Sequence, residues 1–416
     1  MLSPFICNAV ATKEDRRPRK EKATAASSSS MDIQGDLPPA SGADAPAPCN
    51  VIVKAEGVGV GARKWLHLSG HQAEVFTCAW NPATKQMASG SADGVCRLWN
   101  LSEVAQEKWD EPESHVAIRS AILVHTMYSG ERNKDVTAAS WSPDGACLAT
   151  GCYDGMVRLW DNMGCPKRLL TEHQGPVFSA KWNKAGTLLL TAGHDTRANI
   201  WDATTGELRF SSKTHALPIM DVDWLDNDTF ATCSSDKSIV VHTVSSSEVK
   251  SLLGHTSEVN IVAWSPDGVY LASCSDDHTA KIWTVADGLL HDLTGHSKEV
   301  YAMRWAPAHV NKPLLLCTAS FDGTAKIWNG TQGTLVYTLA RHNQPLYSIA
   351  PSPDANYVAV GSLGGHVSIW KLSDGSLYRE FKGTGDTYDV SWSADGSLLS
   401  SCFSSGTIRV VDPYVW

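Results

Sequence analysis

Tryptophan recurs along this 416-residue chain at an interval close to 41 residues, and this period limits the possible folds more than any other feature. Each of these tryptophans ends a short phrase with a hydrophobic residue three positions earlier and Leu or Ile directly before it. The phrases end at Trp99, Trp160, Trp201, Trp283, Trp328 and Trp370. His242 and Val411 stand where the period places two further members. A period of about 40 residues indicates a repeat protein, and the sequence therefore predicts eight repeats.

Other residue types keep register with these tryptophans. An Asp lies six residues before six of the eight positions, a Ser or Thr lies ten before seven, and a His lies 27–32 residues before six. Each repeat also contains short strand-like segments separated by turn residues, such as Val75–Trp80, Gln86–Gly90 and Val95–Trp99. Four antiparallel strands per repeat, eight times over, predict an all-β, eight-bladed β-propeller.

The His, Ser/Thr, Asp and Trp positions predict a buried polar network in each blade. The Asp would accept a hydrogen bond from the His ring, the His would reach the hydroxyl, and the indole N–H would end the chain of contacts. Such a network is stabilising when every member is satisfied. The same residue types form hydrolase triads, but a set repeated six times and expected to be buried predicts no enzyme. The residues assigned to the network are His71, Asp93, Trp99, His173, Asp195, Trp201, His255, Asp277, Trp283, His296, Asp322 and Trp328.

The two ends of the repeat array predict how the ring closes. The last repeat supplies only three strands, near 388–392, 397–401 and 407–411, and Lys64–Ser69 has the pattern of the missing outer strand. This strand would join the last blade to the first and remove the free edges of an open sheet. The propeller is therefore expected over residues 64–412, with its main insertion at 101–133.

Residues 1–63 differ in composition from the repeats. They contain an Ala/Ser run and a Pro/Ala/Gly-rich stretch. A segment with so little apolar surface is expected to be a disordered, low-complexity region. Its basic run, Arg16–Lys22, suits either a nuclear-import signal or a solvated linker.

Charge and cysteine content exclude several classes of function. The formal net charge of −9 argues against direct nucleic-acid binding, sequence-specific binding included. The eleven cysteines form no CxxC pair and no zinc-ligand spacing, so we expect reduced thiols, no metal and no cofactor. No apolar run approaches 18 residues, so no membrane association is expected.

Two positions per repeat are expected to meet at one end of the propeller channel, namely the second residue of each innermost strand and the residue before the turn Asp. The aromatic residues there are Phe76, Tyr153, Phe178, Tyr301, Phe321, Tyr347 and Tyr388. Carboxylates are expected at the same end. The residues directly before the innermost strands supply Glu74, Asp135, Glu258, Glu299 and Asp386, and Asp276 stands at the position before the turn Asp. Aromatics ringed by acids predict a protein-binding rim for a basic peptide. The alternatives are aromatics that pack the channel wall and acids that belong to ordinary solvated loops.

Several stretches are more specific than the repeat. These stretches resemble the transducin-β-like family of WD-repeat corepressor subunits, over about 66–412, and they are Gly70–Pro82, Asn133–Thr137, Leu148–Gly155, His215–Trp224 and Leu271–Asp277. The resemblance implies a non-enzymatic scaffold in the nucleus that joins corepressor and histone deacetylase subunits and binds histone tails. An alternative is a substrate receptor or adaptor that links regulators to a ubiquitin ligase. Members of that family normally begin with a helical LisH module and an F-box-like segment, and residues 1–63 lack the apolar helical periodicity for either.

Overall fold

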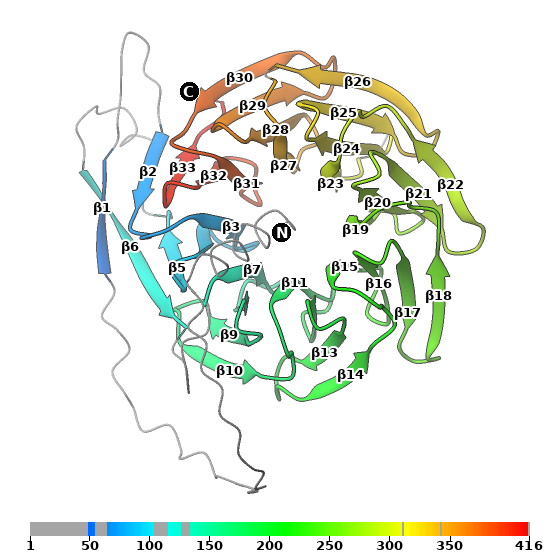
Figure 1. Ribbon diagram of the computed structural model, residues 1–416. Helices are drawn as coiled ribbons and strands as arrows, with labels where there is room; N and C mark the ends of the chain where they lie inside the picture. The colour runs from blue at the N-terminus through cyan, green and yellow to red at the C-terminus, as the bar shows by residue number, and fades with distance from the viewer. Residues whose placement is uncertain are drawn as a thin grey trace, which may run out of the picture.

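The computed structural model describes residues 49–54, 65–102, 115–125, 134–309, 312–341 and 343–414. These residues form 33 strands, which are arranged as the blades of a ring around a central channel (Figure 1). Six blades are separate four-stranded antiparallel sheets, and the first and last blades belong to one sheet of nine strands. Successive innermost strands contact one another around the whole ring. The predicted all-β, eight-bladed propeller is therefore confirmed.

Strand bounds follow the chain from the innermost to the outermost strand of each blade. Blade 1 consists of β3 (Val75–Trp80), β4 (Gln86–Ser91), β5 (Val95–Asn100) and β6 (His115–Val124), and blade 2 of β7 (Val136–Trp141), β8 (Cys147–Cys152), β9 (Val157–Asp161) and β10 (Pro166–Leu170). Blade 3 consists of β11 (Val177–Trp182), β12 (Leu188–Gly193), β13 (Ala198–Asp202) and β14 (Leu208–Ser212). Blade 4 consists of β15 (Ile219–Trp224), β16 (Thr229–Ser234), β17 (Ile239–Thr243) and β18 (Glu248–Leu252). Blade 5 consists of β19 (Val259–Trp264), β20 (Leu271–Ser275), β21 (Ala280–Thr284) and β22 (Gly288–Leu293). Blade 6 consists of β23 (Val300–Trp305), β24 (Leu315–Ser320), β25 (Thr324–Asn329) and β26 (Thr334–Ala340). Blade 7 consists of β27 (Leu346–Pro351), β28 (Tyr357–Ser362), β29 (His366–Lys371) and β30 (Leu377–Lys382). Blade 8 consists of β31 (Thr387–Trp392), β32 (Leu399–Phe403), β33 (Thr407–Val411) and β2 (Trp65–Ser69).

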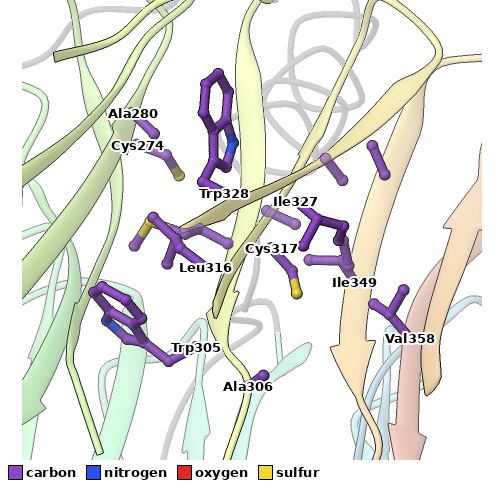
Figure 2. Packing of buried hydrophobic residues seen from close by; sticks show 14 of the residues in the cluster. Cys274, Ala280, Trp305, Ala306, Leu316, Cys317, Ile327, Trp328, Ile349 and Val358 are labelled. Carbon is purple, nitrogen blue, oxygen red and sulfur yellow. The ribbon is translucent and has the colours of Figure 1, made fainter. Parts of the chain in front are cut away.

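The hydrophobic core lies between adjacent blades. The second and third strands of most blades are buried almost throughout, because each blade is covered by a neighbour on both faces. Figure 2 shows Trp305, Leu316 and Trp328 of blade 6 in one cluster with Cys274 of blade 5 and Val358 of blade 7. Burying one such large apolar side chain contributes roughly 1.5–3 kcal/mol, so every blade is stabilised mainly by the two blades beside it.

A second series of tryptophans joins neighbouring blades by hydrogen bonds. Trp141, at the end of β7, donates its indole N–H to the backbone oxygen of Ala79 in β3, at 3.1 Å. The same kind of contact to the previous blade, 2.8–3.1 Å long, is made by Trp80, Trp141, Trp182, Trp224, Trp305 and Trp392. Most blades share no sheet hydrogen bonds with one another. These indole contacts therefore help to set how each blade lies against the next.

The ring closes through β2. All five residues of Trp65–Ser69 pair antiparallel with β33, from Trp65 opposite Val411 to Ser69 opposite Thr407. Leu66 and Leu68 point into the core and are buried. The outer strand that the sequence predicted over Lys64–Ser69 thus completes blade 8, and Lys64 itself lies outside the described residues.

One described strand lies within residues 1–63. Cys49–Lys54 forms β1, which pairs with β6 over six residue positions and touches β2 at Lys54. Val51, Ile52 and Val53 are β-branched and favour strands, and the outer edge of β6 supplies unpaired backbone groups. This strand lies near the end of the segment expected to be disordered; the other residues of 1–63 lie outside the described part of the chain, and for them the expectation stays a prediction.

The described residues bear on two further expectations. The nine cysteines from Cys78 to Cys402 are free, and seven of them are buried. No described helix is long and apolar enough to cross a membrane.

Candidate functional site

Each innermost strand begins with a β-bulge. In β3, Val75 pairs with Ser91 and Thr77 pairs with Gly90, so Phe76 is the extra residue between two ladder pairs. A bulge adds one residue to a strand and re-aims its side chain. The same register shift occurs in all eight blades, and it places at this bulge position Phe76, Thr137, Phe178, Met220, Asn260, Tyr301, Tyr347 and Tyr388.

A backbone hydrogen bond brings two more side chains of each blade to the bulge. In blade 6, the amide of Phe321, which lies in the turn before β25, donates to the carbonyl of Glu299, which lies directly before β23, at 3.0 Å. Bonds of 2.8–3.0 Å at the equivalent positions occur in all eight blades. We call these places the turn position and the lead position. The end of the channel where the bulge, turn and lead positions meet is called the channel mouth.

Five aromatic side chains form a continuous arc at the channel mouth, over blades 6, 7, 8 and 1. Phe321 stacks on Tyr301 with ring centroids 4.5 Å apart, and Tyr301 lies 5.0 Å from Tyr347. The arc continues from Tyr347 to Tyr388 at 5.6 Å and from Tyr388 to Phe76 at 5.8 Å. Phe321 and Tyr388 are half-buried, while Phe76, Tyr301 and Tyr347 are buried. Packing of the channel wall therefore accounts for part of the role of these three residues.

Two of the seven expected aromatics lie outside this aromatic arc. Phe178, at the bulge position of blade 3, is buried and packs in the core cluster that also contains Met220 of blade 4. Tyr153, at the turn position of blade 2, is half-buried. Both residues occupy positions at the channel mouth, but the bulge positions of blades 2, 4 and 5 carry Thr137, Met220 and Asn260, which supply no ring to extend the arc. That all seven rings belong to one binding surface stays a prediction.

Carboxylates flank one end of the aromatic arc. Asp386 occupies the lead position of blade 8, the blade that carries Tyr388, and Glu74 occupies the lead position of the adjacent blade 1. Burial raises the pKa of Tyr388 to about 12, and the negative charges of Asp386 and Glu74 contribute to this rise. The carboxylate of Asp386 also accepts the amide of Gly364 at 2.7 Å. Asp135, at the lead position of blade 2, is buried.

A second group of carboxylates lies near the other end of the aromatic arc, where blade 5 meets blade 6. Glu258 and Asp276 occupy the lead and turn positions of blade 5, and Glu299 occupies the lead position of blade 6. Burial raises the pKa of Asp276, and the charges of Glu258 and Glu299 raise it further. Asn260, at the bulge position of blade 5, donates to Asp276 at 2.7 Å. The sequence placed Asn260 at this position but did not single it out as a site residue.

The channel beyond the bulges is polar. A cavity of about 170 Å³ lies among the innermost strands, and Lys181, Arg304 and Asp389 contribute charged groups to its lining. Asp389 accepts hydrogen bonds from the backbone amide of Cys78 at 3.0 Å and from the hydroxyl of Ser348 at 3.2 Å. The inner strands therefore carry charges that the sequence analysis did not single out. Within the described residues, no group of three or more His, Cys, Asp or Glu is arranged to hold a metal ion.

The polar network connects the turn of each regular blade to its core. In blade 3, His173 contacts Asp195 at 2.9 Å through Nδ1 and Thr191 at 2.8 Å through Nε2, and Trp201 donates to the Thr191 hydroxyl at 2.8 Å. The corresponding distances are 2.7–2.9 Å in blades 1, 5 and 6. The twelve residues assigned to the network are thus all joined. Because both nitrogens of each His are occupied and the rings are buried, these sets are suited to hold the blade together and not to act as a catalytic base.

Blade 2 builds its network from a histidine that the sequence analysis missed. His125 contacts Thr150 at 2.9 Å, and Trp160 donates to the same hydroxyl at 2.9 Å. Asp154, at the usual Asp position, instead forms an ion pair with Arg158 at 3.1 Å. His125 lies 35 residues before Trp160, outside the spacing of the other repeats, because the insertion alters the offset. Its place directly after the apolar strand β6 was the available indication.

Blade 4 replaces the network tryptophan with His242. His215 still contacts Asp236 at 3.0 Å and Thr232 at 2.7 Å. The His242 ring stacks on Phe230, its cross-strand partner, with centroids 4.7 Å apart. The residue at the position of Phe230 is Met87 in blade 1 and Leu148 in blade 2. The larger Phe230 therefore fills space that the smaller His242 leaves.

Comparison with known proteins agrees with this architecture. The family described as "WD domain, G-beta repeat" matches residues 63–100, 122–161, 164–202, 206–243, 246–284, 288–329, 333–371 and 375–412. The crystal structure of the C-terminal WD40 domain of Sif2 has a TM-score of 0.71 at 24% identity and covers 85% of this chain and 99% of that chain. That structure shows the same fold.

Two curated relatives are similar over most of the propeller. The F-box-like/WD repeat-containing protein TBL1X of Mus musculus is 43% identical over 356 residues, which are 83% of this chain and 66% of that protein. The WD40 repeat-containing protein HOS15 of Arabidopsis thaliana is 39% identical over 353 residues, which are 83% of this chain and 57% of that protein. The matched part thus spans about two thirds or less of the length of these relatives. Eight matched repeats and this identity show that the chain belongs to the WD-repeat family and, within it, to the transducin-β-like group.

Proposed function

We propose that this protein is a scaffold subunit of a nuclear corepressor–histone deacetylase complex and that its channel mouth binds the basic tail of a histone. Membership of the transducin-β-like group supports a scaffold role in corepression. The observation that carries the binding part is the position of the aromatic arc between two groups of carboxylates. The net charge of −9 also favours a cationic partner.

The chemistry of the channel mouth suits Lys and Arg side chains. Their cationic heads pair with carboxylates, and their stems and charges lie favourably over aromatic rings. Exposed ion pairs contribute only about 0–1 kcal/mol each and weaken as salt screens them. Aromatic anchors contribute more, and replacing one with Ala costs about 2 kcal/mol or more where it is a hot spot. Binding should therefore depend on both groups and should weaken as salt rises.

Fluorescence anisotropy with a labelled histone-tail peptide tests this proposal. Wild type is compared with Glu299→Lys and Phe321→Ala at low and high salt. Glu207→Lys serves as the control, because Glu207 is exposed on the outer side of blade 3 and undergoes the same charge reversal. Tyr301→Ala is less suitable than expected from the sequence, because Tyr301 is buried and its removal would also reduce stability.

Glu299→Lys should weaken binding about fivefold or more at low salt, which corresponds to about 1 kcal/mol. Phe321→Ala should weaken binding at both salt concentrations, and Glu207→Lys should have little effect. Equal losses for Glu299→Lys and Glu207→Lys would show attraction to net charge alone. Unchanged binding in both mouth variants, with folding intact, would place the partner on another face.

Affinity purification of the tagged protein tests the proposed complex. We expect a histone deacetylase and a corepressor in the purified material. Cullin-type ligase subunits without a deacetylase would instead favour the ubiquitin-ligase alternative, to which the words "F-box-like" in the name of TBL1X point. Imaging of the tagged protein tests the nuclear localisation directly.

A further inference from the structure

Asn260 brings an unsatisfied hydrogen-bond acceptor to the channel mouth. Its Nδ2 donates to Asp276 at 2.7 Å and to the backbone oxygen of Val300 at 3.1 Å. Because both partners are acceptors, the two contacts establish which end of the amide carries the nitrogen. The residue is 6% exposed, and the Oδ1 atom of its side chain has no hydrogen-bond partner. A buried acceptor without a donor is unfavourable, so this position suits a ligand that supplies an N–H group.

This amide contacts one member of a group of three carboxylates whose charges act on one another. Asn260 contacts the Asp276 side chain directly. It also donates to the backbone oxygen of Val300, which directly follows Glu299 in the chain. Glu258 lies at the lead position of the same blade, where the Ser235 hydroxyl donates to its carboxylate at 3.1 Å. Among the described residues, no Lys or Arg forms an ion pair with any of these carboxylates. Burial raises the pKa of Asp276, and the like charges of Glu258 and Glu299 also raise it. A bound cation would relieve this repulsion.

We propose that this group, which we call the acidic junction (Glu258, Asn260, Asp276 and Glu299), binds the guanidinium of one arginine side chain of a peptide at the channel mouth. The inference rests on the function proposed above and adds to it the type of side chain that is recognised and the place where it binds. Its basis is an unpartnered buried acceptor beside carboxylates that come from two adjacent blades.

Arginine fits this arrangement better than lysine. A guanidinium is planar and carries five N–H donors, so one edge can pair with a carboxylate while another N–H reaches Asn260. A lysine ammonium is a compact point charge that is strongly hydrated and has only three donors. The stacked Tyr301–Phe321 pair follows on blade 6, and the Phe321 amide is bonded to the Glu299 carbonyl. Guanidinium groups stack on aromatic faces more readily than ammonium groups do.

The test compares two labelled peptides of equal charge on the full chain. One is a histone H4 tail peptide, and the other has Lys in place of every Arg. We expect wild type to bind the Arg peptide about tenfold more tightly, the effect of one charge-assisted hydrogen bond. Asp276→Asn keeps the side-chain shape and should remove most of this preference. Glu258→Gln is a second variant of the acidic junction and should reduce the preference in the same direction, which keeps the test decisive if one variant fails to fold.

Glu74→Gln is the matched control. Glu74 occupies the same lead position in blade 1, at the opposite end of the aromatic arc. This variant should weaken both peptides slightly and leave the preference for Arg intact. Equal affinity of wild type for the two peptides, or a preference that persists in Asp276→Asn and Glu258→Gln, would overturn the acidic junction while leaving histone-tail binding in place. Failure of wild type to bind either peptide would overturn the proposed binding function and this inference together.

Discussion

Replacing Asp195 with Ala tests whether the polar network stabilises blade 3. The Asp195 carboxylate accepts hydrogen bonds from His173 at 2.9 Å, from the amide of Gln174 at 3.1 Å and from the amide of Arg197 at 3.2 Å. The variant leaves His173, a buried residue, with a donor that water does not reach. Leaving a buried donor unsatisfied costs about 1–3 kcal/mol. The two amides are more exposed and can bond to water, so we expect a total loss of about 2–3 kcal/mol.

The effect of Asp195→Ala should depend on pH. Burial alone would raise the pKa of Asp195, but the hydrogen bond and charge of His173 and the amide of Gln174 outweigh burial and lower it. A carboxyl whose pKa is lowered by folding stabilises the folded state above its unfolded pKa, near 4, and loses this contribution as the pH falls through the folded pKa. The difference between wild type and Asp195→Ala should therefore be complete at pH 7 and shrink below about pH 4.

Urea denaturation at pH 7, followed by circular dichroism, measures this difference. Glu207→Ala is the control in the same blade, because Glu207 is exposed and its contact with Arg209 is 3.5 Å long. An exposed pair of this kind contributes about 0–1 kcal/mol. If Asp195→Ala and Glu207→Ala unfold at the same urea concentration as wild type, the network does not stabilise the blade.

Three further predictions concern the fold. His242→Trp should destabilise the protein because Phe230 fills the space, and adding Phe230→Leu should recover part of the loss; additive effects in a double-mutant cycle would contradict this coupling. Deleting residues 1–69 should prevent folding because β2 is lost, whereas deleting 1–48 should not, and equal stability of the two truncations in denaturant would refute closure through β2. Stability should fall as the pH drops from 7 to 5. Burial lowers the pKa of His242 to about 4 and of His125 to about 3, so the unfolded chain takes up protons first, near pH 6.5. A urea midpoint that does not change over this pH range would contradict the prediction.

The sequence by itself was sufficient for features that repeat within one blade. Trp99 and Ser89 are ten residues apart and face each other across one hairpin, as Trp283 and Ser273 do in blade 5. A constant spacing along the chain therefore becomes a constant contact in space. The blade count, the polar network and the closing strand all depend on relations of this kind or on a strand missing from the last repeat.

Features that depend on variable segments were harder to predict. His125 escaped the spacing rule because extra residues between it and Val136 lengthen the offset to Trp160, although the tertiary position of the histidine is the usual one. The pairing of β1 with β6 joins residues about 65 positions apart and carries no periodicity. No local pattern indicates that such a strand finds this edge.

Only the tertiary structure decided which side chains meet at the channel mouth. The sequence placed Phe178 and Tyr301 at the same bulge position, yet Tyr301 joins the aromatic arc and Phe178 packs into the core. The acidic junction likewise needs Asn260 and Glu299 from adjacent blades. The physical reason is that contacts between blades depend on the size and orientation of side chains about 40 residues apart. These properties vary from blade to blade, whereas the hydrogen-bonded spacing within a blade does not.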